Sequence, residues 1–278
     1  MESQREVYPL SLMLRVYDVS RTGYYSWRSR GESARACSDR RLLTSVERVF
    51  GESGGLYGSP KVTNALRSEG LVVGENRIAR LMRENELVAR CAAIYRRRPG
   101  LNRFFSKITN RICDLEATGP DQIWVGDVTY LEVNGVWRYL AVVLDLYSRR
   151  VVGWSLSRHR DVSLSLEAFK RAASKRLEIS GLYFHSDRGA EYVALRYQRW
   201  LEERGVVQSM NRKGKMTDNA TMESFFHNFK AEWVHRRTFT TEKELRAAIA
   251  SYVFFYNERR LHSSLGYRTP VGYELEVA

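Results

Sequence analysis

The chain has 278 residues, a net charge of +13 and an isoelectric point of about 9.8, and 44% of its residues are hydrophobic. It has no run of eighteen apolar residues and no apolar segment behind a basic start, which argues against a transmembrane helix and a secretory signal, so we expect a cytoplasmic protein. Its three cysteines form no C-x-x-C pair, which argues against a cysteine zinc site. The positive charge favours a polyanionic partner, although it can also serve solubility alone.

Residues 1–90 are predicted to form short helices separated by tight turns, because apolar residues recur at helical spacing between capping residues. We expect these helices at Pro9–Tyr17, from the cap Ser20 to Arg28, after the cap Ser38, from the cap Ser59 to Gly70, and over 74–87.

A basic helix that follows another short helix is typical of a helix-turn-helix, whose second helix can enter the major groove of DNA. The last helix of this region carries Arg77, Arg80 and Arg83 toward solvent. An ordinary helical bundle with solvated arginines explains the same pattern, and the residues alone leave both readings open. We interpret residues 1–90 as a helix-turn-helix DNA-binding region, with Arg77 and Arg80 as DNA contacts.

Residues 91–121 are predicted to form a basic linker. Arg96, Arg97 and Arg98 lie between a tyrosine and a proline, and two phenylalanines follow. Basic residues interleaved with aromatic ones can follow a DNA backbone and stack on unpaired bases. We therefore expect these three arginines to contact DNA, which is compatible with a simple extended connector.

From Gln122 onward the pattern changes to β-strands that then alternate with helices, so we take residues 122–278 as one α/β domain. Asn134-Gly135 predicts a hairpin turn between the first two strands. The order of elements predicts a mixed five-stranded sheet flanked by helices. Strands are expected at 122–133, 137–148, 151–158, 182–187 and 206–210, and helices at 162–175, 192–203, 219–234 and 242–261.

Carboxylates stand on three separate elements of this domain. Asp127 lies inside the first strand, Asp187 ends the fourth, and Glu223 occupies a helix beside its apolar stripe. A charged group among apolar residues is costly without a ligand or partner, and Mg²⁺ prefers carboxylate oxygens. Taken singly, however, each of these residues could equally be a capping or ion-paired carboxylate.

Motifs along nearly the whole chain resemble the second-frame protein of the insertion-sequence-three family of transposases. From about Gln122 to Tyr273 the chain also resembles the integrase core of the DDE superfamily, named after its two aspartates and one glutamate. The matching segments are VSRTGYYSW, YGSPKV, RIARLMRENEL, WVGDVTYL, LDLYSRRVVGW, HSDRGAEY, RKGKMTDNATMESFFHNFK and YNERRLHSSLGYRTPVGYE. Thirty-five residues separate Asp187 from Glu223, which is the spacing of this family.

The resemblance implies a ribonuclease-H-like core in which Asp127, Asp187 and Glu223 bind two Mg²⁺ ions, with Mn²⁺ as a substitute, and catalyse DNA cleavage and strand transfer. It places Lys230 at the basic position that contacts DNA two turns after Glu223. The partners it implies are double-stranded DNA at the terminal inverted repeats and the target, and further copies of the chain on DNA. It also implies fusion to an upstream-frame protein by frameshifting, and a place at the bacterial nucleoid.

Two positions depart from the family pattern, with Glu191 where glutamine is usual and Thr221 where proline is usual. Neither is expected to touch the three carboxylates. Asp145 and Asp218 are rival carboxylates, which the resemblance assigns to structural places. Zinc is not expected, because the histidine-cysteine module of retroviral integrases is missing.

Two other functions fit parts of the sequence. A nuclease of the same fold would cut DNA without joining strands, and a sequence-specific DNA-binding repressor would not need the carboxylates. The helical N-terminal region argues against the first, and the intact set of carboxylates argues against the second.

Overall fold

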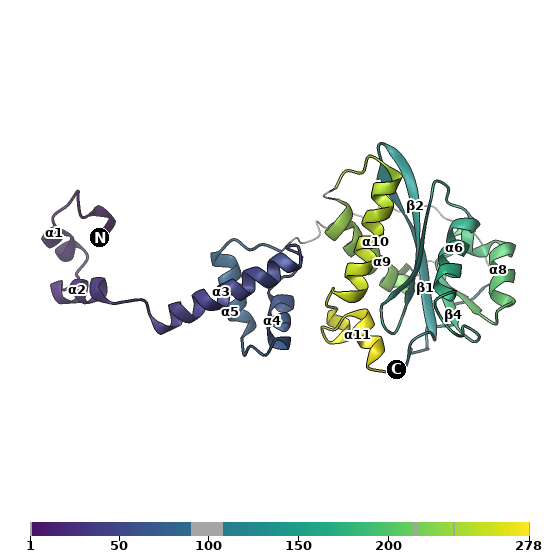
Figure 1. The fold of residues 1–278 in the computed structure, drawn as a ribbon, viewed down its shortest axis with the longest axis horizontal. Coiled ribbons are helices and arrows are strands. Elements are labelled where there is room, and N and C mark those ends of the chain that lie inside the picture. The colour runs from purple at the N-terminus through teal and green to yellow at the C-terminus, as the bar shows by residue number, and fades with distance from the viewer. Residues whose placement is uncertain (1, 90–107, 214–215, 236, 278) are drawn as a thin grey trace.

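The computed structural model describes residues 2–89, 108–213, 216–235 and 237–277 (Figure 1). Within these ranges no helix is both long and apolar enough to cross a membrane. The predicted DNA contacts Arg96, Arg97 and Arg98 lie outside the described residues.

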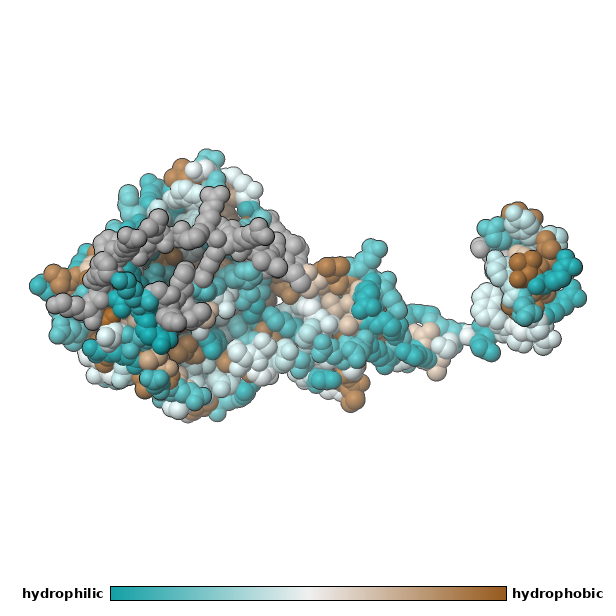
Figure 2. Space-filling view, turned by 180° about the vertical axis from the view of Figure 1, so that it is seen from behind, coloured by the Kyte–Doolittle hydropathy of each residue, from teal (hydrophilic) through white to brown (hydrophobic). Residues whose placement is uncertain are grey.

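A small helical pair opens the chain and lies apart from the other helices (Figure 1). The pair is α1 (Leu10–Val16) and α2 (Arg21–Ser29), preceded by the short 3-10 helix η1 (Glu2–Gln4), and Ser20 caps α2 as predicted by accepting from the Gly23 amide. Its buried apolar side chains are Met13 and Tyr24. Figure 2 shows apolar surface on this pair, to which Val7, Tyr8, Val16, Tyr17 and Trp27 contribute exposed side chains.

Three further helices form a compact unit, which we call the helical unit: α3 (Ala34–Glu52), α4 (Ser59–Ser68) and α5 (Glu75–Glu84). Val46, Val62 and Ile78 are among the fully buried side chains of its core. Two predicted caps are wrong. Ser33 caps α3, because its hydroxyl accepts from the Ala36 amide, and Gly58 rather than Ser59 precedes α4.

The second part of the chain contains the predicted mixed sheet of five strands, in the order β3-β2-β1-β4-β5. The first three strands run antiparallel, whereas β4 and β5 run parallel to β1. Asn134 and Gly135 make the predicted hairpin turn with positive φ angles of 46° and 75°. The strands are β1 (Ile123–Val133), β2 (Val136–Asp145), β3 (Val151–Ser157), β4 (Tyr183–Ser186) and β5 (Val207–Met210).

Helices cover both faces of the sheet, and each face has its own apolar core (Figure 1). One face carries α6 (Val162–Ala173), α7 (Ala190–Val193) and α8 (Leu195–Glu202). The other carries α9 (Ala220–Phe229), which follows η2 (Met216–Asn219), and α10 (Glu242–Glu258). The chain closes with η4 (Ser263–Leu265) and α11 (Pro270–Leu275).

Two predicted helices are each divided in the structure. The expected helix over 192–203 is interrupted at Ala194, whose ψ of 134° is extended, so α7 and α8 are separate. The expected helix over 219–234 changes after Phe229 into a π-helical segment, η3 (Lys230–Val234). Such π segments are rare and are frequent at functional sites.

Candidate active site

Asp127 is a half-buried carboxylate in the middle of β1. Its Oδ1 accepts a hydrogen bond of 2.7 Å from the Val128 amide. Burial and then the neighbouring charge of Asp187 raise the pKa of Asp127 to about 8. The carboxylate is thus in a place where its ionised form is unfavourable without added positive charge.

Asp187 comes beside Asp127 because β4 is the parallel neighbour of β1. Gly126 pairs with Ser186 in this ladder, and an aspartate directly follows each of them. Asp127 and Asp187 therefore come side by side. The Gly189 amide donates to Asp187 Oδ1 at 2.9 Å, and burial raises the pKa of Asp187. A side chain at position 189 would meet this oxygen, since a Cβ there would lie 2.9 Å from it.

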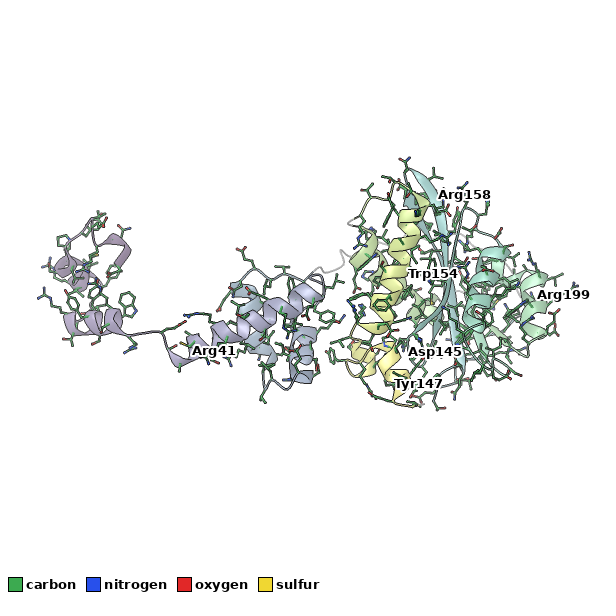
Figure 3. The ribbon with its side chains drawn as sticks, viewed as in Figure 1. Arg41, Asp145, Tyr147, Trp154, Arg158 and Arg199 are labelled. Carbon is green, nitrogen blue, oxygen red and sulfur yellow. The ribbon has the colours of Figure 1, made fainter. Side chains whose placement is uncertain are left out.

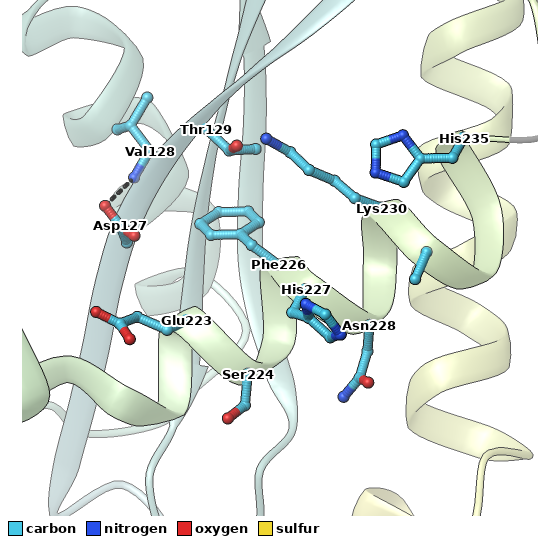
Figure 4. A pocket seen from close by; sticks show the side chains of 11 residues that line it. Asp127, Val128, Thr129, Glu223, Ser224, Phe226, His227, Asn228, Lys230 and His235 are labelled. Atoms are coloured by element: carbon cyan, nitrogen blue, oxygen red, sulfur yellow. Dashed lines mark hydrogen bonds between the residues drawn. The ribbon is translucent and has the colours of Figure 1, made fainter. Parts of the chain in front are cut away.

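Glu223 comes from a helix, not from the sheet, and faces the pocket that Asp127 lines. It lies on α9 and, together with Asp127, lines an open pocket of about 600 Å³ (Figure 4). Figure 4 shows its carboxylate pointing from α9 toward β1. The remaining side chains that line the pocket come from β1, α9 and the segment after it: Val128, Thr129, Ser224, Phe226, His227, Asn228, Lys230, Ala231 and His235.

The three carboxylates are not gathered into one tight cluster. Among the described residues, no three histidine, cysteine, aspartate or glutamate side chains are close enough together to hold one metal ion. Asp127 and Asp187 interact through their charges, whereas Glu223 shares the pocket with Asp127. A shared metal site would therefore need the Glu223 carboxylate to come closer to the two aspartates.

The start of α9 is tethered to β1 next to Asp127. Asn219 Nδ2 donates to the Gly126 carbonyl at 3.3 Å, while its buried Oδ1 has no hydrogen-bond partner within the described part of the chain. Thr221, one of the two departures from the family pattern, accepts a hydrogen bond of 2.6 Å from Arg149. These contacts determine where the Glu223 helix begins.

Lys230 lies two turns after Glu223 and extends across the pocket toward β1 (Figure 4). Its Nζ stands 4.6 Å from the centre of the Tyr130 ring. Burial lowers the pKa of this ammonium, and the charge of Asp127 opposes that effect. A cation is thus present in the pocket that contains Asp127 and Glu223.

Arg160 and Glu191 form a neighbouring ion pair that the sequence did not predict. The guanidinium donates to Glu191 Oε1 at 2.8 and 3.0 Å, and the Glu191 side chain is only 4% exposed. The charge of Glu191 raises the pKa of Asp187, and that of Arg160 lowers it. Glu191 therefore influences the aspartates electrostatically without a hydrogen bond to them. Glutamate at a position where the family has glutamine was the available signal that a cation lies nearby.

The rival carboxylates have structural partners. Asp145 is fully buried and accepts from the Ser148 amide at 2.8 Å and from the Asp121 amide at 2.7 Å. Figure 3 places it at the end of the sheet near Tyr147, whose ring lies 5.1 Å from that of Tyr273 on α11.

Asp218 instead pairs with Arg212 at 2.8 Å, and this contact lowers its pKa. His185 donates or accepts at both ring nitrogens, toward Ser209 at 2.9 Å and Asn211 at 2.7 Å, as a satisfied strand histidine does.

Arg77 and Arg80, the predicted DNA contacts of the helical unit, both donate to Asp39 on α3. The distances are 2.6 Å from Arg77 and 2.5 Å from Arg80, and Arg80 also pairs with Glu84 at 2.9 Å. The Ser38 hydroxyl accepts from Arg77 at 2.8 Å, so Ser38 contacts α5 instead of capping α3. Both arginine side chains stay 35% exposed despite these partners.

Comparison with protein families finds three matching models, which describe two kinds of domain. Two models described as integrase core domain match residues 117–216 and 204–270, and one described as HTH-like domain matches residues 38–98. These matches confirm the predicted ribonuclease-H-like core and the helix-turn-helix character of the helical unit.

Curated proteins similar to the chain include the transposase InsF for insertion sequence IS3A of Escherichia coli K12. It is 34% identical, covering 99% of this chain and 96% of that protein. The transposase for insertion sequence element IS904 of Lactococcus lactis is also 34% identical, over 85% of this chain and 94% of that protein.

Among solved structures, the simian T-cell lymphotropic virus intasome in complex with a PP2A regulatory subunit contains a similar chain. The TM-score is 0.50 at 13% identity, covering 82% of this chain and 74% of that one. This likeness concerns the fold.

Proposed function

Because the chain belongs to the insertion-sequence-three family of transposases, we propose that Asp127, Asp187 and Glu223 are the carboxylates with which it cleaves and joins DNA. The observation that carries this assignment is the adjacent pair of half-buried carboxylates Asp127 and Asp187, which directly follow the paired residues Gly126 and Ser186. Burial and mutual repulsion raise the pKa of Asp127 to about 8, and neither aspartate forms an ion pair with a described residue. Such a pair favours a bound cation.

The residues around the pair fit a divalent ion such as Mg²⁺, with Mn²⁺ as a substitute. The donors are carboxylate oxygens, which hard cations prefer. Asn219, whose buried Oδ1 has no hydrogen-bond partner in the described chain, donates to the carbonyl of Gly126, directly before Asp127. Bound divalent ions supply activation of an attacking oxygen and stabilisation of a leaving oxygen. Asp127 and Asp187 would hold them from the sheet, and Glu223 would complete the set from α9.

The protein's own residues orient these ligands. The Val128 and Gly189 amides each donate to one carboxylate oxygen and thereby limit the rotation of Asp127 and Asp187. The Lys230 ammonium lies in the same pocket and can neutralise a phosphate oxygen of DNA as a compact charge. In the reaction we propose, water attacks a phosphodiester at the element end and frees a 3′ hydroxyl, which then attacks a second phosphodiester.

Recognition of the element ends falls to the basic N-terminal part of the chain. We infer that Arg77 and Arg80 contact double-stranded DNA at the terminal inverted repeats, and that Arg96, Arg97 and Arg98 follow its backbone. Residues 1–90 would then form the DNA-binding region, residues 91–121 the linker and residues 122–278 the catalytic domain. Bringing two ends together requires at least two copies of the chain, and we propose that an upstream-frame segment, fused by frameshifting, links them at the nucleoid.

The direct test is incubation of the purified chain with duplexes that carry its own element ends and Mg²⁺, followed by separation of each labelled strand. We expect a cleaved strand with a 3′ hydroxyl and a longer joined product, both lost in a chelator and in Asp187→Asn. Cleavage without joining would favour the nuclease alternative. End binding with no cleavage by the wild-type chain, alone or fused to the upstream segment, would favour the repressor.

A further inference from the structure

The segment YNERRLH (residues 256–262) is one of the motifs that carry the family resemblance, yet the active site does not use it. Arg260, at its centre, forms a buried ion pair with Glu232 of the π segment that directly continues α9. Their shortest distance is 2.7 Å, and the two side chains are only 8% and 10% exposed. The Tyr252 hydroxyl also donates to Glu232, at 3.2 Å. The end of the Glu223 helix is thus held by the segment that follows α10.

The helical unit also binds this segment, through Tyr57 in the loop between α3 and α4. The Tyr57 hydroxyl donates to the Arg259 carbonyl at 2.8 Å and accepts from the Leu261 amide at 3.0 Å. One phenol therefore binds the backbone on both sides of Arg260, across about two hundred residues of sequence. Tyr57 belongs to another family motif, YGSPKV, and its side chain is buried.

Apolar contacts accompany these polar ones. Phe255 and Leu261 pack against the core of α3, α4 and α5. Phe255 also stacks on Trp233 of the π segment, with ring centres 6.0 Å apart. Tyr256 packs edge-on against Phe225 of α9 at 5.0 Å. The helical unit, the end of α10 and the Glu223 helix are therefore continuously packed.

We propose that Tyr57, Arg260 and Glu232 form a clamp through which the helical unit, once it holds an element end, sets the position of α9, and with it Glu223 and Lys230, against β1. This inference rests on the proposed function, because it is Glu223 that α9 brings to the aspartates. The three are positioning residues, since none of them lines the pocket of Asp127 and Glu223.

The clamp gives DNA binding a route to the active site. Glu223 lines the same pocket as Asp127 from α9, so the placement of α9 sets how its carboxylate meets the two aspartates. DNA bound to the helical unit can favour one placement of that unit, and the clamp passes this preference to α9. Coupling of this kind is reciprocal, so closing the active site should also tighten end binding.

The test compares Tyr57→Phe with Tyr197→Phe in the full-length chain. Both changes remove one buried phenol hydroxyl and keep the ring, but that of Tyr197 has no hydrogen-bond partner among the described residues. Two activities are measured with Mg²⁺: strand transfer of duplexes carrying the element ends, and nicking of an unrelated plasmid. Hydrogen exchange of amides 220–234 is followed with and without the end duplex.

We expect Tyr57→Phe to lower strand transfer about tenfold, because two backbone groups lose their partner, while plasmid nicking stays within about twofold. The end duplex should slow exchange in 220–234 of the wild-type chain and of Tyr197→Phe, but not of Tyr57→Phe. Adding Glu232→Gln to Tyr57→Phe should cost less than the product of the two single effects, because both act on one connection.

Equal behaviour of Tyr57→Phe and Tyr197→Phe would overturn the clamp, as would an equal loss of transfer and nicking, which indicates a merely structural role. Multiplicative effects of the two substitutions would overturn it too. Asp187→Asn, run in parallel, separates the two hypotheses. If that variant is inactive, the proposed function stands whatever Tyr57→Phe does, and if it remains active, the proposed function fails.

Discussion

Asp39 in the helical unit and Asp127 in the sheet are the same residue type in opposite surroundings. Arg80 and then Arg77 lower the pKa of Asp39, whereas burial and then Asp187 raise that of Asp127 to about 8. Asp39 is ion-paired inside the helical unit, whereas the sheet domain holds two carboxylates side by side, neither of which forms an ion pair with a described residue. An aspartate with two arginines holds helices together, while an aspartate beside another aspartate favours a cation from outside.

The largest effect that this comparison predicts is on catalysis. Asp127→Asn, Asp187→Asn and Glu223→Gln should each lower cleavage and strand transfer by at least about a thousandfold, since they remove a group that acts as part of a unit. Binding to end duplexes in a gel-shift assay should change little. Asp39→Asn and Asp145→Asn are the matched controls, because the former is ion-paired and the latter has backbone partners. A control as inactive as the triad variants at equal folded fraction would break the distinction.

The next effect concerns stability and pH. The folded-state pKa of Asp127, about 8, lies above its ordinary value of 3.8. Folding is therefore favoured at acid pH, and this contribution is lost as the pH rises through 8, because the unfolded chain releases the proton more readily.

Without metal, we expect Asp127→Asn to raise the free energy of unfolding at pH 8 by at least about 2 kcal/mol and to flatten its decline between pH 5 and 8. Millimolar Mg²⁺ should stabilise the wild-type chain but not this variant. Urea unfolding in chelator and in Mg²⁺ measures both. If the free energy of unfolding changed with pH in the same way in the wild-type chain and in Asp127→Asn, the raised pKa of Asp127 would be contradicted.

A smaller effect should separate structural from DNA-binding roles of the arginines in the helical unit. If Arg77 and Arg80 each contact a phosphate despite Asp39, then Arg77→Ala with Arg80→Ala should weaken end binding about tenfold near 0.1 M salt. The slope of log affinity against log salt should become shallower by about 1.8. Asp39→Asn should strengthen binding, because it removes the negative charge that both guanidinium groups share. Unchanged affinity and slope in the double variant would make these arginines purely structural.

The smallest effect tests where the two regions meet. Burial and then the charge of Arg260 lower the pKa of Lys61 to about 8, and Glu232 opposes this. A base with a lowered folded-state pKa makes folding more favourable as the pH rises, here from 8 to its ordinary 10.5. We expect a gain of about 1 kcal/mol in the free energy of unfolding across this range, after allowance for partial exposure. Lys61→Met should abolish the gain, and an equal rise in that variant would show that Lys61 is not buried against Arg260.

Much of the fold could be predicted because it depends on neighbours in sequence. Apolar periodicity indicated the five strands and most helices, Ser20 indicated a cap, and Asn134-Gly135 indicated a turn. The wrong predictions concern where single helices begin or break. Ser33 and Ser38 are equally good caps by type, and only the packing of α3 against α5 assigns the second to Arg77. The break at Ala194 has no glycine or proline to mark it.

The sequence by itself determined that the chain is a basic α/β protein with a helical N-terminal region, and it placed Asp127, Asp187 and Glu223 on two strands and a helix. Only the tertiary structure decided which carboxylates lie side by side, that Arg160 pairs with Glu191, and that Tyr57 binds the backbone around Arg260. The reason is that burial and charge act through space. The pKa of a carboxylate depends on what surrounds it in the fold, and those groups come from elements whose separation in the sequence gives no measure of their distance.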